Sequence, residues 1–173
     1  MARIAALLVL CGLMGCGYHQ VGAASHLPAN VQTIAVPLFV SKVQGFKTEA
    51  VFTEAVVREL NTRTRYKVLT AVEAENHADA TLSGVIVKET VTPLTYDASS
   101  GQTSSYLIAV TAQATLTARD GTVLYRNDAF QWRDQFQSTQ DLSGSIQEDS
   151  AAVRRIGAAF GQALVSDMLE SFR

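Results

Sequence analysis

Cys16 is the residue with the clearest chemistry in the sequence. It follows Leu13-Met14-Gly15, and a leucine, any residue, a small residue and then cysteine is the pattern of the bacterial lipobox. In that motif the thiol takes a diacylglycerol, the chain is cut just before the cysteine, and the new amino group is acylated. The sequence therefore predicts a mature chain that begins at a lipid-carrying Cys16. The alternative is a chance cysteine in an ordinary signal peptide.

The residues before Cys16 have the composition of a secretory signal. Arg3 supplies the positive charge, and the run from Ile4 to Leu13 is almost entirely apolar. This run is too short to span a bilayer, which takes about 20 residues. We therefore expect residues 1–15 to be a cleaved signal peptide, residues 16–30 to be a lipid-carrying tether, and residues 31–173 to form a single domain.

Charge and cysteine content limit the partners of the mature chain. Removing the first 15 of 173 residues leaves 158, enough for one domain, and these carry 13 basic and 16 acidic side chains, a formal charge of −3. The lack of a basic bias argues against a nucleic-acid partner. Cys11 is removed with the signal, so no disulfide can form within the chain. The lipid is then the expected membrane anchor. Gly17 stands where an aspartate would be the inner-membrane retention signal of enteric bacteria, so the outer membrane is favoured, with the protein anchored on its periplasmic side.

Residue types that usually carry catalysis are not placed for it. The three histidines, His19, His26 and His77, do not stand at metal-ligand spacing with a cysteine, a carboxylate or each other. His77 lies near Asp79 in a polar stretch, which is more typical of a solvated loop than of a general base. Nucleophile-elbow, phosphate-loop and dinucleotide patterns are absent. We expect no catalytic residue, metal or cofactor, although a missing motif does not exclude an enzyme.

The order of the expected elements predicts an α+β fold. Alternating and helical periodicities predict strands and helices in this order: strand Val31–Phe39, helix Thr48–Asn61, a short strand or strand lead-in at Arg65–Thr70, strands Ala80–Val91, Tyr106–Arg119 and Thr122–Phe136, and a helix from Ile146 onward. A right-handed crossover through the first helix would make the strands that it joins parallel. We therefore expect a two-layer sandwich, with a mixed four-stranded β-sheet and two α-helices on one face.

Several patterns locate the core more closely. The even-numbered residues of Tyr106–Arg119 are apolar and the odd-numbered ones mostly polar, so one face of this strand should be buried. Asp120-Gly121 predicts a hairpin turn, and a change of phase near Asn127-Asp128 predicts a bulge. Ile34, Val36 and Leu38 should share a buried face. Three aromatic residues are expected in the core, with partner or acyl-chain contact as the alternative: Phe130, Trp132 and Phe136.

Gly157 and Gly161 stand four residues apart in the last helix. In a charged, amphipathic helix this spacing indicates close packing against the sheet rather than dimerisation in a membrane.

A set of features occurs in one order along almost the whole mature chain. They are Cys16-Gly17-Tyr18-His19, Leu27-Pro28 before the strand Val31–Pro37, the run Ala78–Gly84, Tyr96-Asp97 with Gly101, and a long alternating strand from Tyr106 closed by Asp120-Gly121. In this order the chain resembles the LptE family of lipopolysaccharide-assembly outer-membrane lipoproteins.

The resemblance implies a two-layer α/β sandwich without enzymatic activity. It also implies two partners: a large outer-membrane β-barrel, LptD, which such proteins plug and help to assemble, and lipopolysaccharide, which they contact on its way to the cell surface. Only Cys16 is carried over as an individual residue. Curli-secretion lipoproteins and lipoprotein activators of peptidoglycan synthases are the alternative, since they share a lipidated cysteine, an Ile-Ala-Val-Pro strand and a helix. The Tyr106–Arg119 strand favours the LptE family.

Cations provide the candidate contacts to lipopolysaccharide. Helix N-termini and cations both favour phosphate, and lipid A is usually phosphorylated. We expect one end of the sheet to gather the loop Thr92–Ser105, the N-termini of both helices and four cations: Lys42, Lys47, Lys88 and Arg133. Ordinary solvated cations are the alternative, and Glu89 nearby weakens the field.

Overall fold

The computed structural model describes residues 30–43, 48–70, 77–96, 98, 101, 103–137 and 150–172. The elements in these ranges, in chain order, are β1 (Thr33–Ala35), β2 (Val40–Ser41), α2 (Glu49–Arg63), β3 (Lys67–Leu69), β4 (Ala80–Tyr96), β5 (Thr103–Ala118), β6 (Val123–Gln137) and α3 (Ser150–Glu170). The predicted signal peptide and tether, Cys16, Lys47 and the predicted helix start at Ile146 lie outside the described residues.

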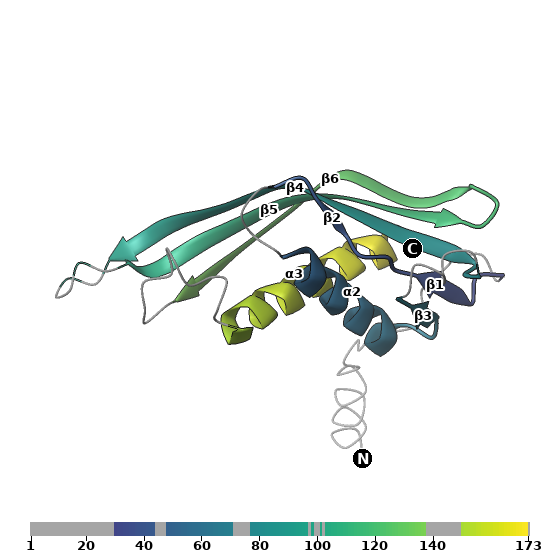
Figure 1. Cartoon of the computed structure of the whole chain (residues 1–173), viewed down its shortest axis with the longest axis horizontal. Coiled ribbons are helices and arrows are strands. Elements are labelled where there is room, and N and C mark those ends of the chain that lie inside the picture. The colour runs from purple at the N-terminus through teal and green to yellow at the C-terminus, as the bar shows by residue number, and fades with distance from the viewer. Residues whose placement is uncertain are drawn as a thin grey trace, which may run out of the picture.

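The fold has two layers (Figure 1). A long, curved sheet forms one layer, and both helices lie on the same side of it. The strand order is β3-β1-β4-β5-β6, with β2 paired to β4. β1 is parallel to β3 and β4, and β2 is parallel to β4, whereas β4, β5 and β6 are antiparallel neighbours. The predicted α+β class and the parallel crossover through α2 are confirmed.

The predicted number of four strands is wrong, because the sheet has six strands among the described residues. The stretch expected to be one strand, Val31–Phe39, contains only the short β1, and β2 follows as a separate strand at Val40–Ser41. The short strand expected within Arg65–Thr70 is present as β3, and it joins the sheet beside β1.

The central hairpin is longer than predicted. β4 continues past Val91 to Tyr96, and β5 begins at Thr103, so most of the predicted loop Thr92–Ser105 is strand. Pro93 does not end β4: it pairs with Tyr106 of β5 next to a register shift, in the part of β4 whose other side pairs with no described strand beyond β2.

The turn and the bulge are confirmed. Gly121 has φ +88°, a conformation that glycine adopts without steric cost. Ala112 pairs with Phe130 and Ala114 with Asn127, so two steps along β5 correspond to three along β6. The extra residue lies beside Asn127, where the change of phase in the apolar pattern predicted it.

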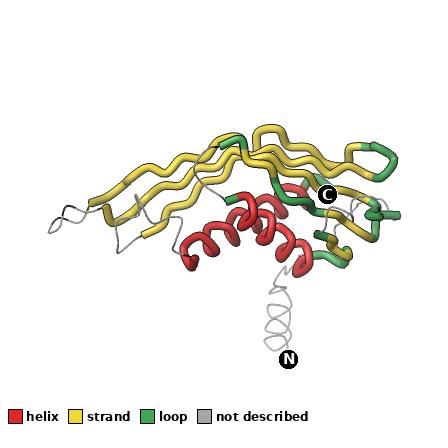
Figure 2. The backbone as a smooth tube through the Cα atoms, in the orientation of Figure 1, coloured by secondary structure: helices red, strands yellow, loops and turns green. Residues whose placement is uncertain are grey.

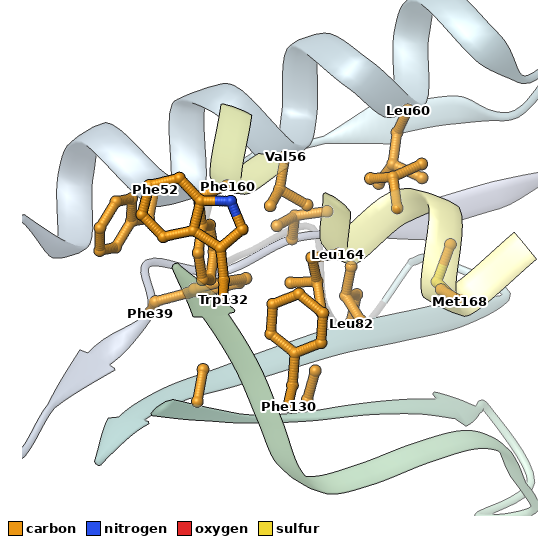
Figure 3. Packing of buried hydrophobic residues seen from close by; sticks show 14 of the residues in the cluster. Phe39, Phe52, Val56, Leu60, Leu82, Phe130, Trp132, Phe160, Leu164 and Met168 are labelled. Carbon is orange, nitrogen blue, oxygen red and sulfur yellow. The ribbon is translucent and has the colours of Figure 1, made fainter. Parts of the chain in front are cut away.

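The core lies between the helices and one face of the sheet (Figures 2 and 3). The even-numbered residues of β5 from Tyr106 to Leu116 are buried, as predicted. Phe160 of α3 stacks on Phe52 of α2 with ring centroids 4.3 Å apart, and it lies edge-on to Phe130 and Trp132 of β6. Phe130 and Trp132 are therefore core residues, whereas the side chain of Phe136 lies outside the described part.

The glycines of α3 face α2, so the prediction that they pack on the sheet is wrong. A Cβ added to Gly157 would lie 2.6 Å from the side chain of Val51, and one added to Gly161 would lie 2.8 Å from the carbonyl carbon of Ala55. The four-residue spacing indicated a close approach, but it could not show which element approaches.

Leu38 is also misplaced by the sequence pattern, since its side chain is 59% exposed while Ile34 and Val36 are buried. β1 ends at Ala35, and Phe39 takes the inward position instead. The Phe39 N–H donates to Thr53 Oγ1 at 3.0 Å. These contacts leave Leu38 at the edge of the sheet.

Candidate binding face of the sheet

The described helices cover only one of the two faces of the long sheet. Both described helices lie over the even-numbered side of β5, and no described element covers the other side, which we call the helix-free face (Figure 2). On β5 this face carries Thr111, Gln113, Thr115 and Thr117, all half-buried. Because these side chains are polar, the helix-free face is suited to contact water or a polar ligand.

Lys88 lies on the helix-free face of β4. It pairs with Thr111, after a register shift that follows Ile86. The next residue, Glu89, points to the other side, where its Oε2 accepts a hydrogen bond from Thr48 Oγ1 at the start of α2, at 2.9 Å. Lys88 is exposed.

Arg133 lies on the same face of β6. It pairs with Ala109 and is exposed, while its neighbour Trp132 is buried against the helices. β4 and β6 flank β5, and Ala109 and Thr111 are two residues apart. The Cα atoms of Lys88 and Arg133 are therefore ~12 Å apart, from a strand spacing of ~4.8 Å and a rise of ~3.4 Å per residue.

Lys42 continues this line across β4. Its backbone N–H donates to Ile86 O at 2.9 Å, which places it beside β4 just before Lys88. We call Lys42, Lys88 and Arg133 the basic row. Within the described residues none of the three forms an ion pair. The carboxylate of Asp128, also on β6, pairs with Arg126 at 2.8 Å and not with Arg133. The row therefore presents uncompensated positive charge.

The position of the row differs from the prediction. Lys88 is eight residues before the end of β4, which is ~26 Å along the strand, so it does not lie at the end of the sheet. The described start of α2 lies on the opposite face, beside Glu89. The structure therefore brings Lys42, Lys88 and Arg133 together, but without the loop or the N-terminus of α2.

Asp79 has a structural role that the sequence pattern did not reveal. Its Oδ2 accepts hydrogen bonds from the N–H groups of Gln32 and Thr33, both at 3.0 Å, and from Thr33 Oγ1 at 2.8 Å. These bonds, that of the Gln32 N–H first, lower the pKa of Asp79, and Arg119 at 3.4 Å contributes less. His77 is exposed and accepts a hydrogen bond from Arg119 at its backbone oxygen. This cluster fastens β1 to the start of β4.

A second polar cluster fastens α3 to β6. Asp167 Oδ2 accepts hydrogen bonds from the Tyr125 hydroxyl at 2.6 Å and from Asn127 Nδ2 at 2.9 Å. Burial and then the Asp167 carboxylate raise the pKa of Tyr125, so its hydroxyl keeps its proton and acts as a donor. A shallow hollow of about 430 Å³ lies beside it, and Tyr125, Asn127 and Asp167 of its lining are engaged in holding the helix.

The described residues contain no group of three or more His, Cys, Asp or Glu side chains placed to hold a metal ion. Neither described helix is long and apolar enough to cross a membrane.

The described residues form an α+β domain with an apolar core, and the helix-free face of its sheet carries the basic row. The model of the LptE family, described as lipopolysaccharide-assembly, matches residues 31–168, and the chain belongs to this family. It is a family of non-enzymatic envelope lipoproteins. A search of curated proteins finds no match.

A comparison with solved structures finds matches that cover most of this chain, with TM-scores below 0.5. The PelC dodecamer from Paraburkholderia phytofirmans is 16% identical, with 82% of this chain and 92% of that chain covered and a TM-score of 0.47. The rare lipoprotein B from Shewanella oneidensis is 11% identical, with coverage of 79% and 95% and a TM-score of 0.45. Lipoprotein GNA1162 from Neisseria meningitidis is 13% identical, with coverage of 80% and 98% and a TM-score of 0.44.

Proposed function

We propose that this protein is an outer-membrane lipoprotein, anchored on the periplasmic side through Cys16, that binds lipopolysaccharide with its basic row. In this proposal it plugs and helps to assemble an LptD-type β-barrel and takes part in transport of lipopolysaccharide to the cell surface. Membership of the LptE family supports the general role. The observation that carries the binding site is the placement of Lys88 and Arg133 on one face, on either side of β5.

The chemistry of the row matches the phosphates of lipid A. Arginine offers a planar fork of donors to phosphate oxygens, and lysine offers a compact charge. Both side chains are exposed, so salt screens them strongly, with a Debye length of about 8 Å at physiological ionic strength. Binding through this row should therefore weaken as salt rises. Lys47 stays a proposed contact, since it lies outside the described residues.

A double charge reversal tests the site. Lys88→Glu with Arg133→Glu should weaken lipopolysaccharide binding and reduce its salt dependence, while the complex with the barrel remains intact. The matched control is Lys67→Glu with Arg155→Glu, which reverses two exposed cations on β3 and α3. Equal loss in both variants would show a non-specific charge effect, and unchanged binding in the first would exclude the basic row.

The barrel partner needs a separate experiment. Detergent extraction through a C-terminal tag should recover an LptD-type barrel in equal amounts with this protein. Recovery of peptidoglycan synthases alone would favour the alternative class of lipoprotein.

A further inference from the structure

An apolar strip runs along the edge of the sheet and ends at the basic row. Leu38 and Val40 are each 59% exposed, and Val87 is 39% exposed. Val40 pairs with the half-buried Val85 of β4. We call Leu38, Val40, Val85 and Val87 the apolar strip.

The strip and the row are continuous along the chain. Leu38, Val40 and Lys42 occupy every second position of this stretch. Phe39, which lies between the first two, points into the core. Val40, Ser41 and Lys42 lie beside β4, and four residues of extended chain, the separation of Leu38 from Lys42, span at most ~13 Å at a rise of ~3.3 Å per residue. The same order recurs on β4, since Val85 and Val87 lie three residues and one residue before Lys88. Positive charge therefore follows apolar surface on two neighbouring strands.

Leu38, alone among the residues of the strip, also lines a groove of about 500 Å³ that lies beside α2 at the edge of the sheet, next to the chain that joins β1 to β2. Its apolar wall comes from Val36, Leu38, Ala50 and Val57, and Glu54 and Arg58 stand one helical turn apart among its other lining residues. In the core beneath the sheet, Phe160 is packed against three other aromatic rings.

We propose that the apolar strip and its groove hold an acyl chain of the same glycolipid whose phosphate the basic row binds. The proposal rests on the proposed function and adds the second half of an amphiphilic ligand. Only a molecule with an anionic head and an adjoining hydrocarbon chain matches cations and apolar surface in this order. Leu38 and Val40 lie on the same short stretch of chain as Lys42, and this continuity favours a chain that enters from the basic row over the lipid on Cys16.

Polar substitution of the strip should separate the two halves of the ligand. Leu38→Gln with Val40→Thr changes exposed side chains, so the fold should survive. The double variant should bind intact lipopolysaccharide about tenfold more weakly, from the lost burial of two aliphatic side chains. It should bind fully deacylated, still phosphorylated lipopolysaccharide as the wild type does. Val123→Thr is the matched control, since Val123 is 50% exposed at the far hairpin turn.

A fluorescent label would report the occupant directly. In the acylated protein Cys16 is blocked, so Val40→Cys provides the one free thiol for an environment-sensitive dye. The emission should shift to the blue with intact lipopolysaccharide and stay unchanged with the deacylated form. An equal shift with both forms of lipopolysaccharide would overturn the proposal. A dye whose emission is already blue-shifted and does not change when lipopolysaccharide is added would also overturn it, and would assign the groove to the protein's own lipid. If intact lipopolysaccharide does not bind the wild type at all, the proposed function itself fails.

Discussion

Gly161 of α3 lies against the backbone of Ala55 of α2, so closely that an added Cβ would be 2.8 Å from the Ala55 carbonyl carbon and 3.0 Å from its Cβ. The two helices therefore pack with almost no space between their backbones at this point. This contact sets how both helices lie over the sheet.

The Gly161→Ala variant tests this contact. Alanine is favoured over glycine in a helix by about 1 kcal/mol, so a free surface position would gain stability. Here the neighbour is backbone and cannot move aside, so we expect a net loss of about 1–3 kcal/mol. Urea unfolding measures it, with Gln162→Ala on the exposed side of the same helix as the control. A gain in stability for Gly161→Ala would show that the helices are further apart.

Gly84→Ala tests the contact between β4 and Phe39. An added Cβ would lie 2.6 Å from three atoms of the Phe39 ring, so we expect a loss of about 1–3 kcal/mol. In the background of Phe39→Leu the same change should cost clearly less, because the smaller side chain leaves room. A double-mutant cycle from unfolding curves gives the coupling, and additive effects would contradict the packing described here.

Asp79→Asn should lower stability at neutral pH but not at low pH. The pKa of Asp79 is lowered in the folded state, so the ionised form is favoured by folding. That contribution is present above the unfolded pKa near 3.8 and is lost as the pH falls through the folded pKa. Unfolding at pH 7 and below pH 3 should show the difference from wild type closing. A difference that does not change with pH would assign the effect to geometry alone.

Glu89→Gln should have the opposite pH dependence. Burial raises the pKa of Glu89, and Glu49 adds to the rise, while the bond from Thr48 lowers it. A carboxyl group whose pKa is raised by folding contributes to stability below its unfolded pKa. This contribution is lost as the pH rises through the folded pKa. The stability of the variant relative to wild type should therefore increase from pH 4 to pH 8, as measured by urea unfolding. Glu59→Gln on α2 is the control, and a gain at pH 4 only would contradict the buried position.

The periodic patterns predicted the faces of the elements better than their ends or neighbours. The even face of Tyr106–Arg119 was predicted because a strand repeats every two residues, and the stripe of α2 because a helix repeats near 3.6. The end of β4 was not predicted, since a strand can continue through a proline such as Pro93 near a sheet edge or an irregular position. Leu38 was misplaced because the alternation assumed for Val31–Phe39 ends at Ala35.

The candidate site shows the same limit. Lys42, Lys88 and Arg133 were selected from the sequence by charge, but their alignment depends on strand register across β2, β4, β5 and β6. Register is set by pairing between distant segments and by bulges, so a single strand does not encode it. The extension of β4 to Tyr96 moved these residues from the expected end of the sheet to its middle.

The most direct measurement is site-specific photo-crosslinking to lipopolysaccharide in cells. Gln131 is exposed on the helix-free face, paired with Thr111 and two residues from Arg133, and Gln162 is exposed on α3. A photoreactive residue at position 131 should capture lipopolysaccharide, and the capture should fall in the background of Lys88→Glu. The same residue at position 162 should capture little. Capture at position 162 with none at 131 would contradict the assignment of lipopolysaccharide to the helix-free face.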